Sequence, residues 1–276
     1  MILRIRNLTL IVLMTCSALS ACSYFDALDS SSESFNVPSK LPLVIGHRGA
    51  AGLAPENTLA AIQTAIDLGV DAVEFDIHRT SDGELVVIHD NDVDRTTDGE
   101  GFVRNLTLAE IKTLDAGSWF GDDFAGEPVP TVRDVFDMVQ VDDVLLFIEL
   151  KDPFLYTGIE DDLVELINEY GYEDRAHILS FYHRSLNVIR DLNPDLVLSG
   201  LWTESPSEDG EGFDVVNARY TMLTRPAEFI ESYHAQGIEV MVWTVNDVAT
   251  MIPLIEAGID GITTDYPDRL LDLLYP

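Results

Sequence analysis

Short runs of apolar, often β-branched residues alternate with more polar segments from Leu43 to the end of the chain. Runs of this length are typical of buried strands, and the segments between them carry the apolar spacing of amphipathic helices. This order predicts one α/β domain with a parallel sheet. Eight runs qualify as its strands, at residues 43–47, 72–78, 144–150, 177–181, 197–202, 214–222, 239–245 and 260–265. Eight strands in a chain of 276 residues predict a (β/α)8 TIM-type barrel over residues 41–276.

The helices between these strands have readable ends. Asn57 or Thr58 is the N-cap of a helix with its apolar residues on one face, and Gly69 ends it. Pro226 begins a later helix, and Gly237 closes it. These boundaries support the alternation of strands and helices that a barrel requires.

Another strand-like run, Leu85 to His89, follows the second predicted strand after only Thr80 to Glu84. Five residues cannot hold a crossover helix, so the two runs are expected to pair antiparallel. Asp82-Gly83 is a common centre for a two-residue hairpin turn. That turn pairs Arg79 with Val86 and Asp76 with His89. A slip of one residue would turn His89 to the opposite face.

The segment from about residue 90 to 130 does not follow the strand and helix alternation. It carries a capping-box pattern from Thr107 to Glu110 and a stretch rich in Gly and Pro from Gly117 to Pro130. We expect it to form a small cap insertion beside the mouth of the barrel, followed by a helix that begins near Thr131.

The first 40 residues are not expected to belong to the barrel. Arg4 and Arg6 precede an apolar run, Leu8 to Leu13, that is too short to span a bilayer, as in a secretory signal. The sequence Leu19-Ser20-Ala21-Cys22 then resembles a bacterial lipoprotein signal, in which residues 1–21 are removed and Cys22 is lipidated. The alternative is an ordinary cleaved signal in which Cys22 has no role.

Residues 22–40 are rich in serine and polar groups, which is typical of a flexible tether. Cleavage before Cys22 would also remove Cys16, so the mature chain would have no second cysteine for a disulfide. Together these features predict an exported protein that is lipid-anchored to a bacterial membrane, on its periplasmic or cell-surface side.

The formal net charge is −33, which makes nucleic acid an unsuitable partner. Such a surface either attracts divalent cations or is simply a solvated acidic surface suited to a salty environment. The charge therefore excludes one class of partner but does not identify an activity.

Acidic residues lie at the ends of two predicted strands. Glu74 and Asp76 are two residues apart, so their side chains share one face, and Glu149 and Lys151 repeat that spacing. Carboxylates that point together into a barrel repel one another unless a cation lies between them. Carboxylate oxygens are ligands of hard cations such as Ca²⁺ or Mg²⁺, whereas zinc prefers His or Cys. Taken singly, each acid could be a surface or ion-paired residue; the set predicts one divalent cation.

Two histidines lie where barrel enzymes keep their chemistry. His47 ends the first predicted strand, next to Arg48, and the predicted hairpin brings His89 beside the acidic cluster. Two histidines around one cation site, with an arginine for an anion, favour acid–base catalysis. The other four are expected to be structural or surface residues: His78, His177, His183 and His234.

With these residues identified, the chain resembles the glycerophosphodiester phosphodiesterase family from Leu43 to the C-terminus. The resemblance is carried by five motifs in order along the chain: Gly46-His47-Arg48-Gly49 with Pro55-Glu56-Asn57-Thr58, Glu74-Phe75-Asp76 with Asp82-Gly83 and His89-Asp90, Glu149-Leu150-Lys151, Trp243-Thr244-Val245-Asn246, and Thr264-Asp265-Tyr266-Pro267.

The resemblance implies a TIM barrel that cuts glycerophosphodiesters to glycerol 3-phosphate and an alcohol. It implies a metal held by Glu74, Asp76 and Glu149, and an acid–base pair of His47 and His89. The glycerol 2-hydroxyl would attack phosphorus, one histidine would protonate the departing alcohol, and water would then open the cyclic phosphate. The resemblance does not say which histidine is the base. The metal, Arg48 and Lys151 would stabilise charge on the phosphoryl oxygens.

The motifs do not determine two features of the substrate pocket. Ser180-Phe181-Tyr182 departs from the family, which often has a small polar residue after Ser-Phe, and this affects the pocket for the alcohol. Trp243 either stacks on the glycerol or fills the barrel.

Two other functions compete with this one. The same barrel could remove the headgroup of a lysophospholipid or sphingolipid, as a phospholipase D does, or the chain could be a surface lipoprotein that binds phosphodiesters without turnover. The complete set of five metal and histidine positions argues against a protein that only binds.

Overall fold

The computed structural model describes residues 40–207 and 210–276. The predicted signal peptide, Cys22 and nearly all of the tether lie outside the described residues. The barrel belongs to a unit that runs from Asn36 to Pro276. Within the described part of the chain, no helix is long and apolar enough to cross a membrane.

Eight parallel strands form a closed ring, because β1 pairs with β9 on one side and with β2 on the other. They match the eight predicted runs: β1 (Leu43–Gly46), β2 (Ala72–Arg79), β4 (Leu145–Leu150), β5 (Ala176–Ser180), β6 (Val197–Trp202), β7 (Val215–Arg219), β8 (Glu239–Trp243) and β9 (Gly261–Thr264). The predicted barrel is therefore confirmed. The strand predicted to end at residue 222 stops at Arg219, because the chain turns into a 3-10 helix, Tyr220–Met222.

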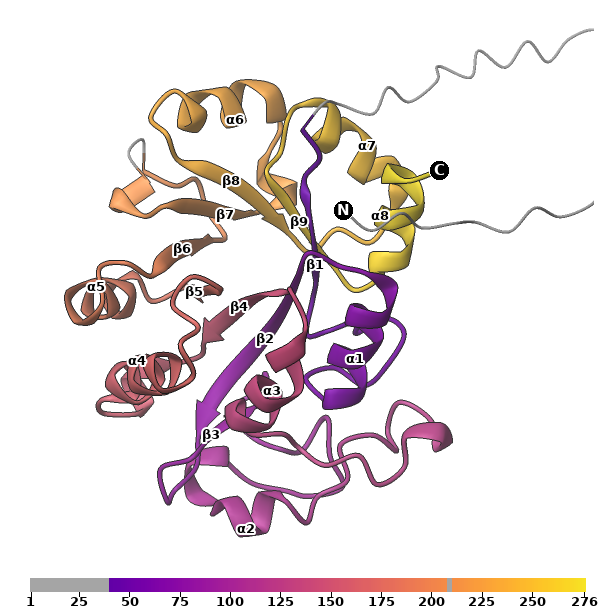
Figure 1. Cartoon of the computed structure of the whole chain (residues 1–276), viewed down its shortest axis with the longest axis vertical. Helices are drawn as coiled ribbons and strands as arrows, with labels where there is room; N and C mark the ends of the chain where they lie inside the picture. Colours follow the sequence, from indigo (N-terminus) through magenta and orange to yellow (C-terminus); the bar gives the residue numbers. More distant parts are fainter. Residues whose placement is uncertain (1–39, 208–209) are drawn as a thin grey trace, which may run out of the picture. The chain divides into compact units, whose positions relative to one another are not determined.

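Helices surround the ring of strands (Figure 1). They are α1 (Leu59–Leu68), α3 (Val132–Met138), α4 (Ile159–Tyr170), α5 (His183–Leu192), α6 (Pro226–His234), α7 (Val248–Glu256) and α8 (Pro267–Leu274). The hydroxyl of Thr58, rather than Asn57, caps α1 by accepting from the Ala61 amide, and Gly69 ends the helix in the left-handed conformation. The helix α6 begins at Pro226 as predicted, and Gly237 follows it with a φ of +79°.

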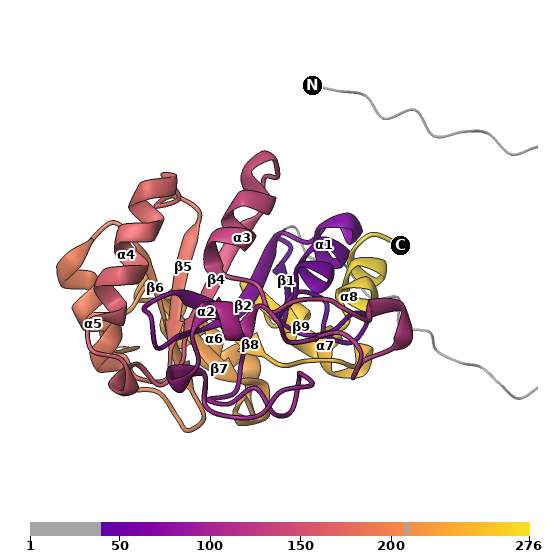
Figure 2. The ribbon, with the colours of Figure 1, turned by 90° about the horizontal axis from the view of Figure 1, so that it is seen from below.

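The insertion after β2 has a small apolar core of its own. It comprises β3 (Leu85–Val87), α2 (Leu108–Ile111) and the 3-10 helices Val103–Asn105 and Asp122–Phe124. The predicted capping box of Thr107 and Glu110 is present at α2, and Thr131 caps α3 in the same way with Asp134. Its buried side chains form one cluster: Val86, Ile88, Val93, Val103, Ile111, Ala116 and Val129. Figure 2 views the domain from this side, with α2 in front of the strands.

The predicted register of the β2–β3 hairpin is wrong by one residue. Arg79 lies opposite Leu85 rather than Val86. The reason is the turn, which contains three residues instead of two and closes with a hydrogen bond of 2.9 Å from the Thr80 amide to the Glu84 carbonyl. Gly83 completes this turn with a φ of +96°, a conformation that favours glycine.

His89 nevertheless reaches the mouth of the barrel. The Ile88 amide donates to the Asp76 carbonyl at 3.0 Å, so a straight strand would have placed His89 one position further along and on the other face. Instead β3 ends at Val87 and the chain bends at His89. The expected position of His89 is therefore observed, but a bend produces it and the hairpin register does not.

The barrel interior changes from apolar to polar along the strands. Its lower layer is one buried cluster: Ile45, Ala72, Phe147, Leu179, Leu201, Val215 and Met241. Residues two positions further along a strand share its inward face. Six of those residues line a cavity: His47, Glu74, Glu149, Phe181, Asn217 and Trp243. The packed layer thus forms the floor beneath a polar site at the carboxyl ends of the strands.

Candidate active site

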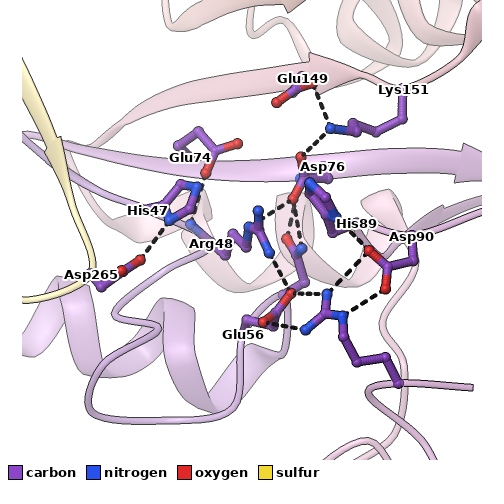
Figure 3. A network of polar contacts seen from close by, with 12 residues as sticks. His47, Arg48, Glu56, Glu74, Asp76, His89, Asp90, Glu149, Lys151 and Asp265 are labelled. Carbon is purple, nitrogen blue, oxygen red and sulfur yellow. Dashed lines mark hydrogen bonds and ion pairs between the residues drawn. The ribbon is translucent and has the colours of Figure 1, made fainter. Parts of the chain in front are cut away.

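Three buried carboxylates meet at the mouth of the barrel. Glu74, Asp76 and Glu149 each place one oxygen within 4.8 Å of the other two. Asp76 and Glu149 are direct register partners on β2 and β4, and Glu74 lies one inward position below Asp76. The structure therefore brings together the three acids that the sequence suggested as metal ligands (Figure 3).

The pKa values of these acids reflect the repulsion between three buried carboxylates that lie close together. Burial, and then the charges of Asp76 and Glu149, raise the pKa of Glu74 well above its ordinary value. Burial and the charge of Asp76 raise the pKa of Glu149 to about 7. Burial opposes ionisation of Asp76 as well, but Arg48 and Lys151 hold its pKa below the ordinary value. A divalent cation would remove this repulsion, and the all-oxygen donor set fits a hard ion.

The turn after β1 directs Arg48 towards the acids. A Cβ on Gly46 would lie 2.3 Å from the Gly49 carbonyl oxygen, so this tight turn requires glycine there. Arg48 has a φ of +50°, its amide donates to Glu74 at 2.8 Å, and its guanidinium Nη1 donates to Glu56 at 2.6 Å. Its Nε lies 3.4 Å from an oxygen of Asp76. Arg48 thus presents a fixed positive charge beside the carboxylates.

Lys151 directly follows the carboxyl end of β4 and supplies a second positively charged side chain. Its ammonium donates to Glu149 at 2.8 Å and lies 3.6 Å from Asp76. Both Arg48 and Lys151 line the cavity, so each is placed to contact an anionic group bound there.

His47 is held by a carboxylate that the sequence analysis quoted in a motif without giving it a role. Its Nδ1 lies 2.5 Å from Asp265, which directly follows β9. Asn246 fixes that carboxylate, since its side chain donates to Asp265 at 2.6 Å and accepts from the Asp265 amide at 2.9 Å. With Nδ1 occupied, the Nε2 of His47 is left for a substrate.

His89 has a matching arrangement. Its Nδ1 lies 2.6 Å from Asp90, which receives two hydrogen bonds from Arg95. Arg95 in turn bridges to Glu56, the partner of Arg48. Burial is the main cause that lowers the pKa of His89, which favours its neutral ring. Figure 3 shows this chain of contacts from His89 back to Arg48.

His78 lies directly behind His89 and is a buried structural residue, one of the two roles expected for it. Its Nε2 is 3.1 Å from the His89 carbonyl oxygen and its Nδ1 is 2.9 Å from the Tyr156 hydroxyl. Because a carbonyl only accepts, Nε2 carries the proton and the tyrosine hydroxyl donates to Nδ1. The pair fixes the backbone at the bend that turns His89 towards the cavity.

Asn57 was named in the sequence analysis as a candidate helix cap and within a motif, without a role at the site. Its side chain donates to Asp76 at 2.8 Å and accepts from the Asp76 amide at 3.1 Å. Asn57, which has a φ of +57°, thus holds Asp76 in position. The signal that could have revealed such supporting residues is their place directly after a strand or directly after a histidine, as for Asp90 and Asp265.

A cavity that opens to solvent, with about 470 Å³ of empty space including its open side, connects these groups. One side is ionic, with His47, Arg48, Glu74, His89, Glu149 and Lys151, and the other side is mostly apolar, with Leu179, Phe181, Leu201 and Trp243. Trp243 forms part of this wall, because its ring meets Phe181 edge to face at 5.4 Å and its Nε1 donates to the Asn217 carbonyl at 3.1 Å.

A second, wider hollow of about 840 Å³ adjoins the first at His89, Glu149, Lys151 and Phe181. It is lined further by Asp90, Asn91, Asp92, Asp152 and Tyr182. Phe181 lines both spaces, whereas Tyr182, the residue at which the sequence departs from the family, lines only the wider hollow.

These features define a class of enzyme: a TIM barrel that acts on an anionic substrate with a divalent cation, two histidines and two fixed positive charges. The model of the glycerophosphoryl diester phosphodiesterase family matches residues 47–269. The chain belongs to that family, as the sequence motifs suggested. Its members are metal-dependent enzymes. Membership confirms that the chain is a glycerophosphodiester phosphodiesterase, as the sequence predicted.

Individual relatives agree with this assignment. The glycerophosphodiester phosphodiesterase of Caldanaerobacter subterraneus subsp. tengcongensis is 42% identical over 236 residues, which cover 84% of this chain and 97% of the relative. A glycerophosphodiester phosphodiesterase of Bacillus subtilis is 33% identical over 249 residues, or 82% of this chain and 84% of that protein.

A solved structure is similar along almost its whole length. A phosphodiesterase from Oleispira antarctica, in complex with its product sn-glycerol-3-phosphate, has a TM-score of 0.80 and 30% identity, and the match covers 86% of this chain and 98% of that one.

Proposed function

We propose that this chain cleaves glycerophosphodiesters to glycerol 3-phosphate and a free alcohol, with His47 and His89 as its acid–base pair. The supporting observation is the pairing of each histidine through Nδ1 with a carboxylate, which leaves both Nε2 atoms for one cavity that also contains the acidic cluster. The Oleispira enzyme's product complex agrees with this choice of product.

The proposed reaction has two stages. In the first, one histidine takes the proton of the glycerol 2-hydroxyl as its oxygen bonds to phosphorus, and the other gives a proton to the departing alcohol oxygen. In the second, water opens the cyclic phosphate and the proton transfers are reversed. Arg48 and Lys151, which both line the cavity, stabilise the added charge on the phosphoryl oxygens.

We propose Glu74, Asp76 and Glu149 as the ligands of one divalent cation. When bound, the ion supplies Lewis acid polarisation of the phosphodiester and of the attacking hydroxyl. Its all-oxygen surroundings favour Ca²⁺ or Mg²⁺ over zinc. The three acids suit either ion, because water or substrate oxygens can complete the coordination shell of both.

The test is release of glycerol 3-phosphate from glycerophosphocholine, measured with chelator and after addition of Ca²⁺ or Mg²⁺. Turnover should require an added cation. Absence of release in the presence of both metals would reject the proposal, and choline released only from a lysolipid would favour phospholipase D-like cleavage instead.

Substitutions at the site should separate loss of chemistry from loss of fold. Glu74→Gln and His89→Ala should each lower kcat by at least about 100-fold while the circular dichroism spectrum is unchanged. Glu165→Gln, on the exposed surface of α4, is the matched control and should leave kcat unchanged. Near wild-type rates in Glu74→Gln or His89→Ala would show that the site has been assigned to the wrong residues.

We also propose that the enzyme is exported and anchored to a bacterial membrane by a lipid on Cys22. The support is the order of basic, apolar and small residues in the first 22 positions. The substrates of such an enzyme would be phospholipid breakdown products outside the cytoplasm.

A further inference from the structure

Asn217 is a buried polar residue that the proposed chemistry does not use. It lies on β7, with 1% of its surface exposed. Neither its Oδ1 nor its Nδ2 has a hydrogen-bond partner within residues 40–207 and 210–276. Buried carboxamides in folded proteins are almost always paired, so an unpaired one calls for a specific explanation.

The side chain lines the cavity of the active site. The ring order of the strands places β7 four strands away from β2 in either direction, so Asn217 and Glu74 come from opposite walls of the barrel. Around Asn217, the near wall consists of Leu201 on β6 and Trp243 on β8. The carboxamide is thus a neutral polar group on the apolar side of the cavity, across from the acids.

A carboxamide both donates and accepts hydrogen bonds and carries no charge, so its natural partner is a hydroxyl. The proposed substrate has two free hydroxyls on its glycerol. The one that attacks phosphorus has to lie by the histidines and acids, whereas the terminal one is a carbon further from phosphorus. The leaving alcohol has the adjoining hollow beside His89 and Lys151 to occupy.

We propose that Asn217 hydrogen-bonds the terminal hydroxyl of the substrate's glycerol and thereby selects glycerol diesters over diesters of shorter or less polar diols. This inference rests on the proposed function. It makes Asn217 a specificity-determining residue, which holds the glycerol with its 2-hydroxyl towards phosphorus. The apolar wall around it disfavours charged groups at this position.

The test compares two diesters that both keep the attacking hydroxyl. One is glycerophosphocholine, and the other is 2-hydroxypropyl phosphocholine, which lacks the terminal hydroxyl. In the wild type, kcat/KM should be about 10- to 100-fold higher for the first, because the second leaves the carboxamide unpaired. In Asn217→Leu, which keeps the branching at Cγ but can neither donate nor accept a hydrogen bond, the ratio should fall to near one. The smaller change Asn217→Ala should have the same effect on the ratio.

The ratio within one variant cancels any general loss of active protein. Ser199→Ala is the matched control, because Ser199 is also fully buried, also has an unpaired side chain among the described residues, and lies on the neighbouring strand without lining the cavity. Its ratio should equal that of the wild type. An unchanged ratio in both Asn217 variants would overturn the inference while leaving the proposed function intact.

A binding measurement separates failure of the inference from failure of the proposed function. If wild-type protein hydrolyses neither diester, the proposed function fails, and glycerol 3-phosphate and 2-hydroxypropyl phosphate are then compared by titration calorimetry. Tighter binding of glycerol 3-phosphate by about tenfold, lost in Asn217→Leu, would support the role of Asn217. Equal affinities in the wild type would overturn it.

Discussion

Each cavity histidine has one ring nitrogen committed to a carboxylate and one free for substrate. For His47 the carboxylate is Asp265, whose second oxygen is bound by the Asn246 amide group at 2.6 Å. Burial opposes ionisation of Asp265, but the hydrogen bond and charge of His47 keep its pKa below the ordinary value. An ionised acceptor requires Nδ1 to carry the proton, so the tautomer with a basic Nε2 is selected.

Asp265→Asn should therefore damage catalysis more than folding. The NH₂ group of Asn246 binds the oxygen of the new amide. The NH₂ group of the new amide therefore faces Nδ1 of His47 and donates to it, which leaves the proton on Nε2, the wrong tautomer for a base. We expect kcat to fall by about 100- to 10,000-fold with KM changed only a few-fold. Steady-state kinetics would check this. Asp247→Asn, at the N-cap of α7, is the control and should change neither value. A kcat within threefold of wild type in Asp265→Asn would contradict the positioning role.

His177 illustrates a histidine whose effect is on stability. It stacks on Phe147 at 4.5 Å, its Nδ1 has no hydrogen-bond partner in the described part of the chain, and burial lowers its pKa to about 4. In the unfolded chain its pKa is about 6.5. Between these values the unfolded state binds the additional proton, so the free energy of unfolding falls as the pH falls from about 6.5 to 4.

The predicted loss from His177 is at most about 3 kcal/mol, obtained from a shift of about 2.5 pKa units. Urea unfolding of the metal-free protein at pH 4.5 and pH 7 would measure it. The difference between the two free energies should be smaller in His177→Leu than in the wild type. Equal differences in the two proteins would show that His177 does not contribute to acid sensitivity.

At the scale of elements, the β2–β3 hairpin shows why a correct position can follow from a wrong register. Asp82-Gly83 is compatible with a two-residue turn and with the last two positions of a three-residue loop, and the residues alone do not distinguish them. The choice depends on contacts made elsewhere, such as the hydrogen bond of 2.8 Å from the Ser81 amide to the Leu106 carbonyl. His89 then depends on a bend that His78 stabilises from behind, which is a long-range contact that no local pattern contains.

The three-residue loop predicts a cost for any side chain at Gly83. Its φ is +96°, and a Cβ there would meet no atom within 4 Å, so the cost of Gly83→Ala is backbone strain alone. We expect a loss of about 1–2 kcal/mol in the free energy of unfolding. Gly121 has an extended φ of 174° and equally open surroundings, so Gly121→Ala should change stability by less than about 0.5 kcal/mol. Equal effects of the two changes in urea unfolding would argue against the observed turn.

At the scale of the whole molecule, the barrel and its ionic wall could be predicted because both follow from local period. An inward position on a strand is always followed by another two residues later. The spacing in the sequence was therefore enough to place Glu74 with Asp76 on one face of a strand, and Glu149 with Lys151 on one face of another. The carboxylate partner of His47 and the polar residue on the opposite wall could not be assigned in this way. Asp265 reaches His47 only because ring closure places β9 beside β1, and Asn217 reaches the cavity from the opposite wall.

The last prediction concerns where this barrel works. If Cys22 carries the lipid and residues 22–40 are a tether as the sequence predicts, a random coil of about 18 residues would give the domain a root-mean-square reach of about 25 Å from the membrane. The net charge of −33 would repel the domain from an anionic lipid surface, which leaves the cavity open to small diesters in solution.

Cells fed a palmitate analogue should therefore label the wild-type protein and retain it in the membrane fraction. Cys22→Ala should be unlabelled and lose membrane retention, with an unchanged kcat/KM for glycerophosphocholine, because the lipid takes no part in the proposed reaction. Cys16→Ala is the matched control, since the chain has two cysteines and this one precedes the proposed cleavage point. It should label as the wild type does. The proposed lipid anchor would be rejected if the wild-type protein were unlabelled. It would also be rejected if Cys22→Ala were still labelled and still found in the membrane fraction.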